Sequence, residues 1–174
     1  MDAFEKIYIF YKQDVYHFLC RLTNYNYSIS EELLSETFYQ AFLSFERFRG
    51  ECEVKTWLCQ IAKNTYSQYV RKEIYKEHLY ERLKLDNSRL REHSVAGDVE
   101  RQAEERELLS CIQMILKDCD KRTRDIVLYR MYAELKFQEI ARILDMKETT
   151  VKVIFYRTKI KIQNELKERF GYEV

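Results

Sequence analysis

The sequence contains no proline and only three glycines in its 174 residues. Short strands joined by tight turns use both residue types heavily, so this scarcity argues against a sheet-rich fold. Apolar residues make up 46% of the chain and aromatic residues 14%, which is too much buried-type side chain for a disordered protein. The composition therefore predicts an all-α fold, with enough length for two small domains.

Cysteine and histidine are too scattered to form a disulfide framework or a metal site. The five cysteines include no CxxC pair, and the three histidines lie far apart in the sequence. The sequence also shows no Ser/His/Asp arrangement and no glycine-rich phosphate loop. We therefore expect reduced thiols, no metal or other cofactor, no catalytic residues and no small-molecule substrate. The protein is predicted not to be an enzyme.

Long apolar runs are missing as well. The longest fall far short of the ~18–20 residues that a membrane-spanning helix needs. The first residues include Asp2 and Glu5 and lack the basic start of a signal peptide. Together these absences lead us to expect a cytoplasmic protein.

The chain carries no large charge of either sign, since its net charge is +1, but the charges are unevenly distributed. Residues 1–72 carry nine acidic and nine basic side chains, residues 73–106 nine and seven, and residues 107–174 eleven and fourteen. The basic excess is concentrated in residues 147–169, with seven basic against three acidic side chains. A basic stripe on one helix suits contact with phosphates, although for charge alone a solvated helix face is the more frequent explanation.

Periodic apolar residues predict two groups of helices, separated by a charged stretch in which apolar residues are sparse. Ser28 is expected to cap the second helix, because Glu31 follows at the spacing of a capping box. The first group is expected near residues 3–24, 28–45 and 54–75 or beyond, and the second near 99–117, 121–132, 137–144 and 149–169. We predict a first domain over residues 1–75, a linker over 76–105 and a second domain over 106–170.

The most specific local pattern is a short helix over residues 137–144, a turn of about three residues, and a longer basic helix from Thr149. The turn requires a residue that tolerates positive φ, and Asp145 is one of the few types besides glycine that does. The 3.6-residue period directs Val151, Phe155, Thr158 and Ile162 toward the short helix.

The opposite face of that helix is predicted to enter the major groove of DNA, with early residues at base edges and Arg and Lys on phosphates. It consists of Thr149, Lys152, Val153, Tyr156, Arg157 and Lys159. The alternative is a helical hairpin that packs and binds nothing, which the agreement of spacing, turn and charge makes less favoured.

In the first half, residues 45–52 place aromatic and basic side chains in a loop between two long helices. The helix that follows carries a polar, aromatic surface, made of Lys63, Asn64, Tyr66, Ser67, Tyr69 and Arg71. Aromatic side chains beside cations suit bases that have left the duplex. Alone this evidence is weak, because surface tyrosines are common and residues such as Phe48 and Trp57 are more often core than stacking platform.

Taken in order, the two groups resemble the extracytoplasmic-function sigma factors, a subfamily of the bacterial sigma-70 family, over nearly the whole chain. Residues 30–38 resemble the helix that docks on the polymerase clamp. Residues 48–64 resemble the segment that melts and reads the −10 promoter element. Residues 124–127, 139–141 and 150–157 resemble the helix-turn-helix that binds the −35 element.

The resemblance implies a promoter-reading sigma factor with three sets of functional residues. Polymerase binding falls to Glu31, Glu32, Ser35, Glu36 and Gln40. Contacts at −10 fall to Phe48, Arg49, Gly50, Lys63, Asn64, Ser67 and Arg71, with Phe48 in the loop that receives an extruded base and Asn64 near it. The implied −35 contacts are Lys152, Val153, Tyr156 and Arg157.

The implied partners are core RNA polymerase, promoter DNA and an anti-sigma protein, often anchored in the membrane. The competing interpretation is a stand-alone transcriptional regulator, whose C-terminal helix-turn-helix binds an operator while the N-terminal helices dimerise or sense a ligand. Such a regulator has no need for exposed aromatic side chains beside Asn64, and it would bind duplex DNA without polymerase.

Overall fold

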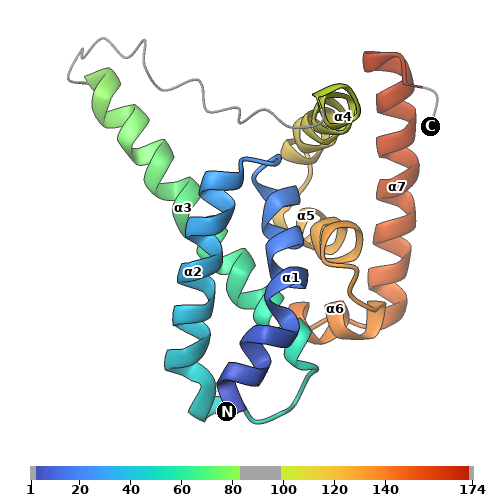
Figure 1. Cartoon of the computed structure of the whole chain (residues 1–174). Coiled ribbons are helices and arrows are strands. Elements are labelled where there is room, and N and C mark those ends of the chain that lie inside the picture. Colours follow the sequence, from blue (N-terminus) through green and yellow to red (C-terminus); the bar gives the residue numbers. More distant parts are fainter. Residues whose placement is uncertain (1–2, 83–98, 173–174) are drawn as a thin grey trace. The chain divides into compact units, whose positions relative to one another are not determined.

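The computed structural model describes residues 3–82 and 99–172, and the chain divides into two compact units, residues 1–97 and 98–174 (Figure 1). Every regular element in the described residues is helical, which confirms the predicted all-α fold. Within the predicted linker, residues 76–82 and 99–105 belong to helices, while residues 83–98 lie outside the described part. The domain boundaries stay predictions.

Unit 1 is a bundle of three helices, each of which contacts the other two. They are α1 (Ala3–Leu22), α2 (Tyr27–Ser44) and α3 (Val54–Arg82), with the short 3-10 helix η1 (Phe45–Arg47) after α2. The apolar positions at helical spacing meet in the core, and each fully buried Val, Leu or Phe side chain stabilises the unit by roughly 1.5–3 kcal/mol. The core includes Val15, Phe18, Leu19, Leu33, Phe38, Leu58 and Ala62.

The connection between α1 and α2 differs from the prediction. Ser28 is not the N-cap of α2, because it already lies in the first helical turn. The cap is Asn26, whose backbone is extended and whose side-chain Oδ1 accepts a hydrogen bond from the Ile29 N–H at 3.2 Å. Asn24 and Tyr25 hold φ angles of 53° and 58°, and these two left-handed residues turn the chain into the cap.

Unit 2 is arranged around its last helix, α7 (Glu148–Phe170), which α4 (Val99–Lys117), α5 (Lys121–Val127) and α6 (Phe137–Leu144) all contact. Its core includes Leu109, Ile112, Ile115, Ile126, Tyr129, Ile140, Val151 and Leu166. Helix α7 ends at Gly171, where φ is +73° and the N–H bonds the carbonyl of Lys167.

Two helix boundaries in unit 2 depart from the expectation. The helix predicted over 121–132 changes to a π-helical turn, η2 (Leu128–Tyr132), whose wider bonding is marked by the Ala133 N–H on the Leu128 carbonyl at 3.3 Å. Neither glycine nor proline signals this change in the sequence. Helix α7 begins at Glu148, one residue early, because the Val151 N–H already bonds the Lys147 carbonyl at 3.1 Å.

Candidate nucleic-acid interface

A tight turn joins α6 to α7 and sets the angle between them. Asp145 adopts φ 51° and ψ 56°, so the prediction of a left-handed residue at this position is confirmed. The N–H of Met146 donates to the carbonyl of Ala141 at 2.9 Å, which closes the end of α6. Three residues therefore carry the chain from one helix into the next.

The two faces of α7 separate as the helical period predicts. Val151, Phe155, Thr158 and Ile162 are buried. Small Ala141 of α6 is also buried, which suits a close approach of the two helices. The hydroxyl of Thr158 donates to the carbonyl of Ile154 at 2.8 Å, so this polar group is satisfied within the core.

The outer face of α7 consists of the six predicted groove residues, and all six are exposed: Thr149, Lys152, Val153, Tyr156, Arg157 and Lys159. Val153 and Tyr156 keep 48% and 55% of their surface in solvent, so apolar side chains stand beside the basic ones on this face. The Lys152 ammonium lies 2.7 Å from the Glu148 carboxylate. Because this pair is exposed, it is weak enough to give way to a phosphate.

An aromatic cluster that the sequence did not indicate supports this face. The ring of Phe137, the first residue of α6, lies 5.4 Å from the ring of Phe155 and 6.0 Å from that of Tyr156. The guanidinium of Arg130 lies 4.7 Å from the centre of the same ring. Contacts of this kind depend on how η2, α6 and α7 pack, so the spacing of residues along the sequence does not predict them.

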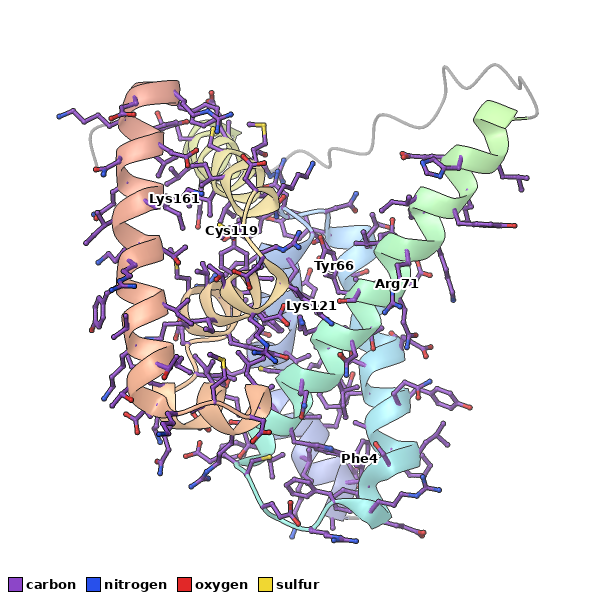
Figure 2. The ribbon with its side chains drawn as sticks, turned by 180° about the vertical axis from the view of Figure 1, so that it is seen from behind. Phe4, Tyr66, Arg71, Cys119, Lys121 and Lys161 are labelled. Carbon is purple, nitrogen blue, oxygen red and sulfur yellow. The ribbon has the colours of Figure 1, made fainter. Side chains whose placement is uncertain are left out.

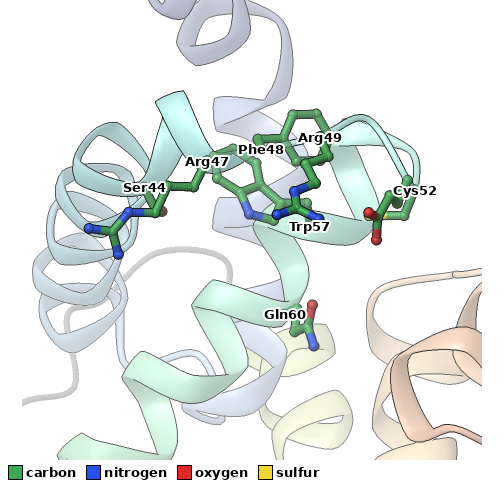
Figure 3. Close-up of a pocket in the computed structure, with 8 residues that line it drawn as sticks. Ser44, Arg47, Phe48, Arg49, Cys52, Trp57 and Gln60 are labelled. Atoms are coloured by element: carbon green, nitrogen blue, oxygen red, sulfur yellow. The ribbon is translucent and has the colours of Figure 1, made fainter.

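In unit 1, the loop after η1 and the start of α3 form an open hollow of about 400 Å³ (Figure 3). The rings of Phe48 and Trp57 stack beside it, 4.7 Å apart and inclined by 28°. Gly50 turns the loop with φ 71°, a conformation that suits glycine. The lining residues are Ser44, Arg47, Phe48, Arg49, Glu51, Cys52, Trp57 and Gln60. The hollow thus combines a flat aromatic surface with two guanidinium groups and an amide.

Polar residues continue from this hollow along α3. Asn64 is exposed and lies four residues beyond Gln60, on the same side of the helix. Ser67 and Arg71 extend the stripe, and Figure 2 labels Arg71 on α3. The Nε of Arg71 donates to the carbonyl of Ser67 at 3.3 Å. The predicted −10 contacts included Asn64, Ser67 and Arg71 but not Trp57 and Gln60, although the helical period backward from Asn64 passes through both. Arg47 belongs to the aromatic and basic stretch 45–52 but was not assigned a contact.

The predicted polar surface of α3 is less uniform than expected. Lys63 is only 9% exposed, so it does not belong to the open surface, and this part of the prediction is wrong. Its position follows from the helical period, because Lys63 is adjacent to buried Ala62 and Cys59. Tyr66 and Tyr69 are half-buried, and burial raises the pKa of both hydroxyls, so they stay protonated and neutral.

The exposed face of α2 is acidic and ends in apolar side chains. The predicted polymerase contacts are all exposed: Glu31, Glu32, Ser35, Glu36 and Gln40. Beyond them Tyr39, Phe42 and Leu43 keep 57%, 58% and 56% of their surface in solvent. Ser30, by contrast, is buried, and its hydroxyl donates to the Asn26 carbonyl at 2.8 Å, so it holds the α1–α2 turn. This face offers carboxylates together with an apolar end.

Nothing in the described residues resembles a metal or redox centre. No group of three His, Cys, Asp or Glu side chains gathers there at metal-binding distance. None of the five cysteines forms a disulfide, and burial raises the pKa of Cys20 and of Cys111, which favours their protonated thiols. None of the described helices combines the length and the apolar character that crossing a membrane requires.

Two family models match the chain in order. The model described as Sigma-70 region 2 matches residues 7–73, and the model described as Sigma-70, region 4 matches residues 109–162. They coincide with the hollow and α3 stripe in the first unit and with the helix-turn-helix in the second.

Curated relatives are similar over most of their length. The chain is 29% identical over 159 residues to the ECF RNA polymerase sigma factor SigM of Bacillus subtilis (strain 168), covering 91% of this chain and 92% of SigM. It is 26% identical over 172 residues to the RNA polymerase sigma factor YlaC of the same bacterium, covering 95% and 92%.

Among solved structures, the fold is similar to that of the sigma factor RpoE in complex with the anti-sigma factor NepR from Bartonella quintana. The TM-score is 0.65 at 16% identity, covering 97% of this chain and 99% of RpoE. CnrH in complex with the cytosolic domain of CnrY gives a TM-score of 0.63 at 15% identity, covering 96% and 89%. These likenesses concern the fold.

Proposed function

This chain belongs to the extracytoplasmic-function subfamily of the sigma-70 family, and on that premise we propose how its two units divide the work of an alternative RNA polymerase sigma factor. Unit 1 binds core polymerase and captures unpaired bases of the −10 element. Unit 2 holds the −35 element as duplex DNA. The observation that carries the proposal is the exposed outer face of α7, whose Arg, Lys and apolar side chains suit base edges and phosphates in a major groove.

At −35, Lys152 and Arg157 donate to phosphates or to guanine acceptors, while Val153 and Tyr156 contact thymine methyl groups. Thr149 and Lys159 lie at the two ends of the same face, where a helix in the major groove approaches the sugar-phosphate backbone of DNA. The exposure of all six side chains supports this assignment.

At −10, Phe48 offers its ring to a base that has left the stack, and Arg49 neutralises the neighbouring phosphate. The hollow of about 400 Å³ beside Phe48 supports this role. Gly50 keeps the loop in its left-handed turn, and Asn64 reads a hydrogen-bonding edge farther along the single strand.

Core polymerase is proposed to dock on the outer face of α2, where Glu31, Glu32, Ser35, Glu36 and Gln40 are exposed. An anti-sigma protein is proposed as the partner of the resting state; the similar RpoE structure is of a complex with the anti-sigma factor NepR. We further propose that the chain has no catalytic activity of its own and acts in the cytoplasm, since promoters and polymerase are there.

The decisive experiment compares DNA binding with and without core polymerase. We expect the full chain to direct core polymerase to selected promoters from a random library, to start transcription there, and to protect little duplex DNA alone. A specific footprint of the free chain, combined with no transcription in the presence of core polymerase, would support the stand-alone regulator instead and overturn the proposal.

A further inference from the structure

The ring of Phe137 lies where the buried and exposed faces of α7 meet. Its neighbours are Phe155 in the core, and Tyr156 and Lys152 on the outer face. The Lys152 ammonium is 5.9 Å from the ring centre, within the range of a cation–π attraction. Because Lys152 and Tyr156 are four residues apart, they lie next to each other, and one ring reaches both.

The ring of Phe137 is also contacted by Arg130, which belongs to another element. The Arg130 guanidinium lies 4.7 Å from its ring centre, and the Nη1 of Arg130 donates to the Leu135 carbonyl at 2.9 Å. Arg130 comes from the π-helical turn η2, and Leu135 from the loop before α6. The ring is therefore enclosed between a fixed guanidinium and the side chains of α7, and its orientation follows from that packing.

We propose that Phe137, together with Arg130, is a positioning residue for promoter recognition: it orders Lys152 and Tyr156 on the outer face of α7 before DNA arrives. The inference rests on the proposed −35 role of this face. Side chains that are already ordered lose less conformational freedom on binding, and for two such side chains the gain is roughly tenfold in affinity. Phe137 itself is only half-exposed and is not assigned a contact with DNA.

The test measures base preference in a randomised −35 library, with the full chain assembled on core polymerase. Phe137→Leu is expected to weaken −35-dependent binding about tenfold and to reduce the differences in preference between bases. Phe137→Tyr, which keeps an aromatic ring, should retain the wild-type affinity and base preference. The matched control is Phe170→Leu, which also removes a ring under an arginine of unit 2, since the guanidinium of Arg169 lies 5.5 Å from the Phe170 ring. The control should keep the wild-type preference.

A double-mutant cycle identifies the route of the effect. If Phe137 acts through the two outer side chains, Phe137→Leu should cost less than about twofold in a Lys152→Ala, Tyr156→Ala background. Full additivity, or a lower melting temperature with an unchanged base preference, would overturn the inference and leave Phe137 a packing residue. A wild-type holoenzyme without any −35 preference would instead overturn the proposed function, and the inference with it.

Discussion

The two units present DNA with surfaces of opposite shape. Unit 1 offers a hollow beside the stacked rings of Phe48 and Trp57. The segment to which it belongs, residues 1–72, carries no net charge. Unit 2 offers a convex helix whose residues 147–169 hold seven basic side chains against three acidic. A hollow lined by rings suits a single base, and a charged helix suits an intact groove. The contrast explains how a chain with a net charge of +1 could still contact DNA, because the cations are concentrated on the helix where we propose that the duplex lies.

The largest effect that this comparison predicts comes from removing cations on α7. Lys152→Ala combined with Arg157→Ala should weaken −35-dependent promoter binding by about 100-fold, because removing one such interaction with DNA costs roughly 1–3 kcal/mol. Binding to core polymerase should be unchanged, since we propose that polymerase docks on the outer face of α2. Filter binding of the holoenzyme and a separate polymerase-binding assay measure the two quantities.

The matched control removes two other cations of α7, with Lys161→Ala and Lys167→Ala. These side chains are exposed but lie beyond the outer face that we assign to the groove. The salt dependence of binding should fall in the test variant by roughly one unit of slope for each phosphate that the variant no longer neutralises. Equal reductions of affinity in test and control variants would mean that α7 acts only through its total charge, and the comparison of a specific groove surface with a base-capturing hollow would fail.

The second effect concerns the hollow. Phe48→Ala should reduce opening of the −10 region about tenfold while leaving binding of a closed duplex promoter almost unchanged, because stacking one base is worth roughly 1–3 kcal/mol. Permanganate reactivity of −10 thymines in the holoenzyme reports the opening. Phe10→Ala is the control, since Phe10 is 79% exposed on α1 and is not part of the hollow. Unchanged permanganate reactivity in the Phe48 variant would contradict the proposal that unit 1 captures unpaired bases of the −10 element.

The two surfaces also differ in how far the sequence predicted them. The outer face of α7 follows from the helical period alone, and Asp145 could be identified as the turn because few residue types accept its φ of 51°. The hollow itself was not predicted: of its lining residues, Phe48 and Arg49 were among the predicted −10 contacts, but Trp57 and Gln60 were not. Which side chains enclose a space depends on how η1, the loop and α3 pack, and a local pattern does not contain that information.

The same limit explains the other differences. Lys63 was predicted to lie on the polar surface of α3, yet its place beside buried Cys59 and Ala62 leaves it only 9% exposed. The capping-box spacing favoured Ser28 as the N-cap of α2. In the structure the left-handed residues Asn24 and Tyr25 lead into Asn26, and this earlier residue is the cap. Local chemistry predicted the helices themselves but not all of their ends.

A smaller effect should separate the stabilities of the two units. Asp145→Val places a β-branched residue in a left-handed conformation, which costs roughly 1–2 kcal/mol and should destabilise unit 2 alone. Trp57 is the only tryptophan and lies in unit 1, so its fluorescence follows unit 1 while far-UV circular dichroism follows both units. We expect urea to unfold part of the dichroism signal earlier and to leave the fluorescence midpoint in place. A common shift of both signals would show that the units unfold together.

The smallest effect arises from the two helix caps. Unit 1 caps α2 with the amide of Asn26, which does not titrate, whereas unit 2 caps α5 with the carboxylate of Asp120, which accepts hydrogen bonds from the hydroxyl and the N–H of Thr123 at 2.6 and 3.1 Å. These bonds lower the pKa of Asp120 in the folded chain. The stabilisation is therefore present above the unfolded pKa of about 3.9 and is lost as the pH falls through the lower folded value.

Asp120→Asn keeps an acceptor at the cap but removes the titration. The difference in urea midpoint between wild type and this variant, followed by circular dichroism, should shrink as the pH falls below about 4, because protonation removes the charge that distinguishes the two chains. The fluorescence of Trp57 should show no such pH-dependent difference, since unit 1 relies on Asn26. A difference that stays constant across this pH range would mean that the carboxylate charge contributes nothing to the cap, and that the two units are capped in the same way.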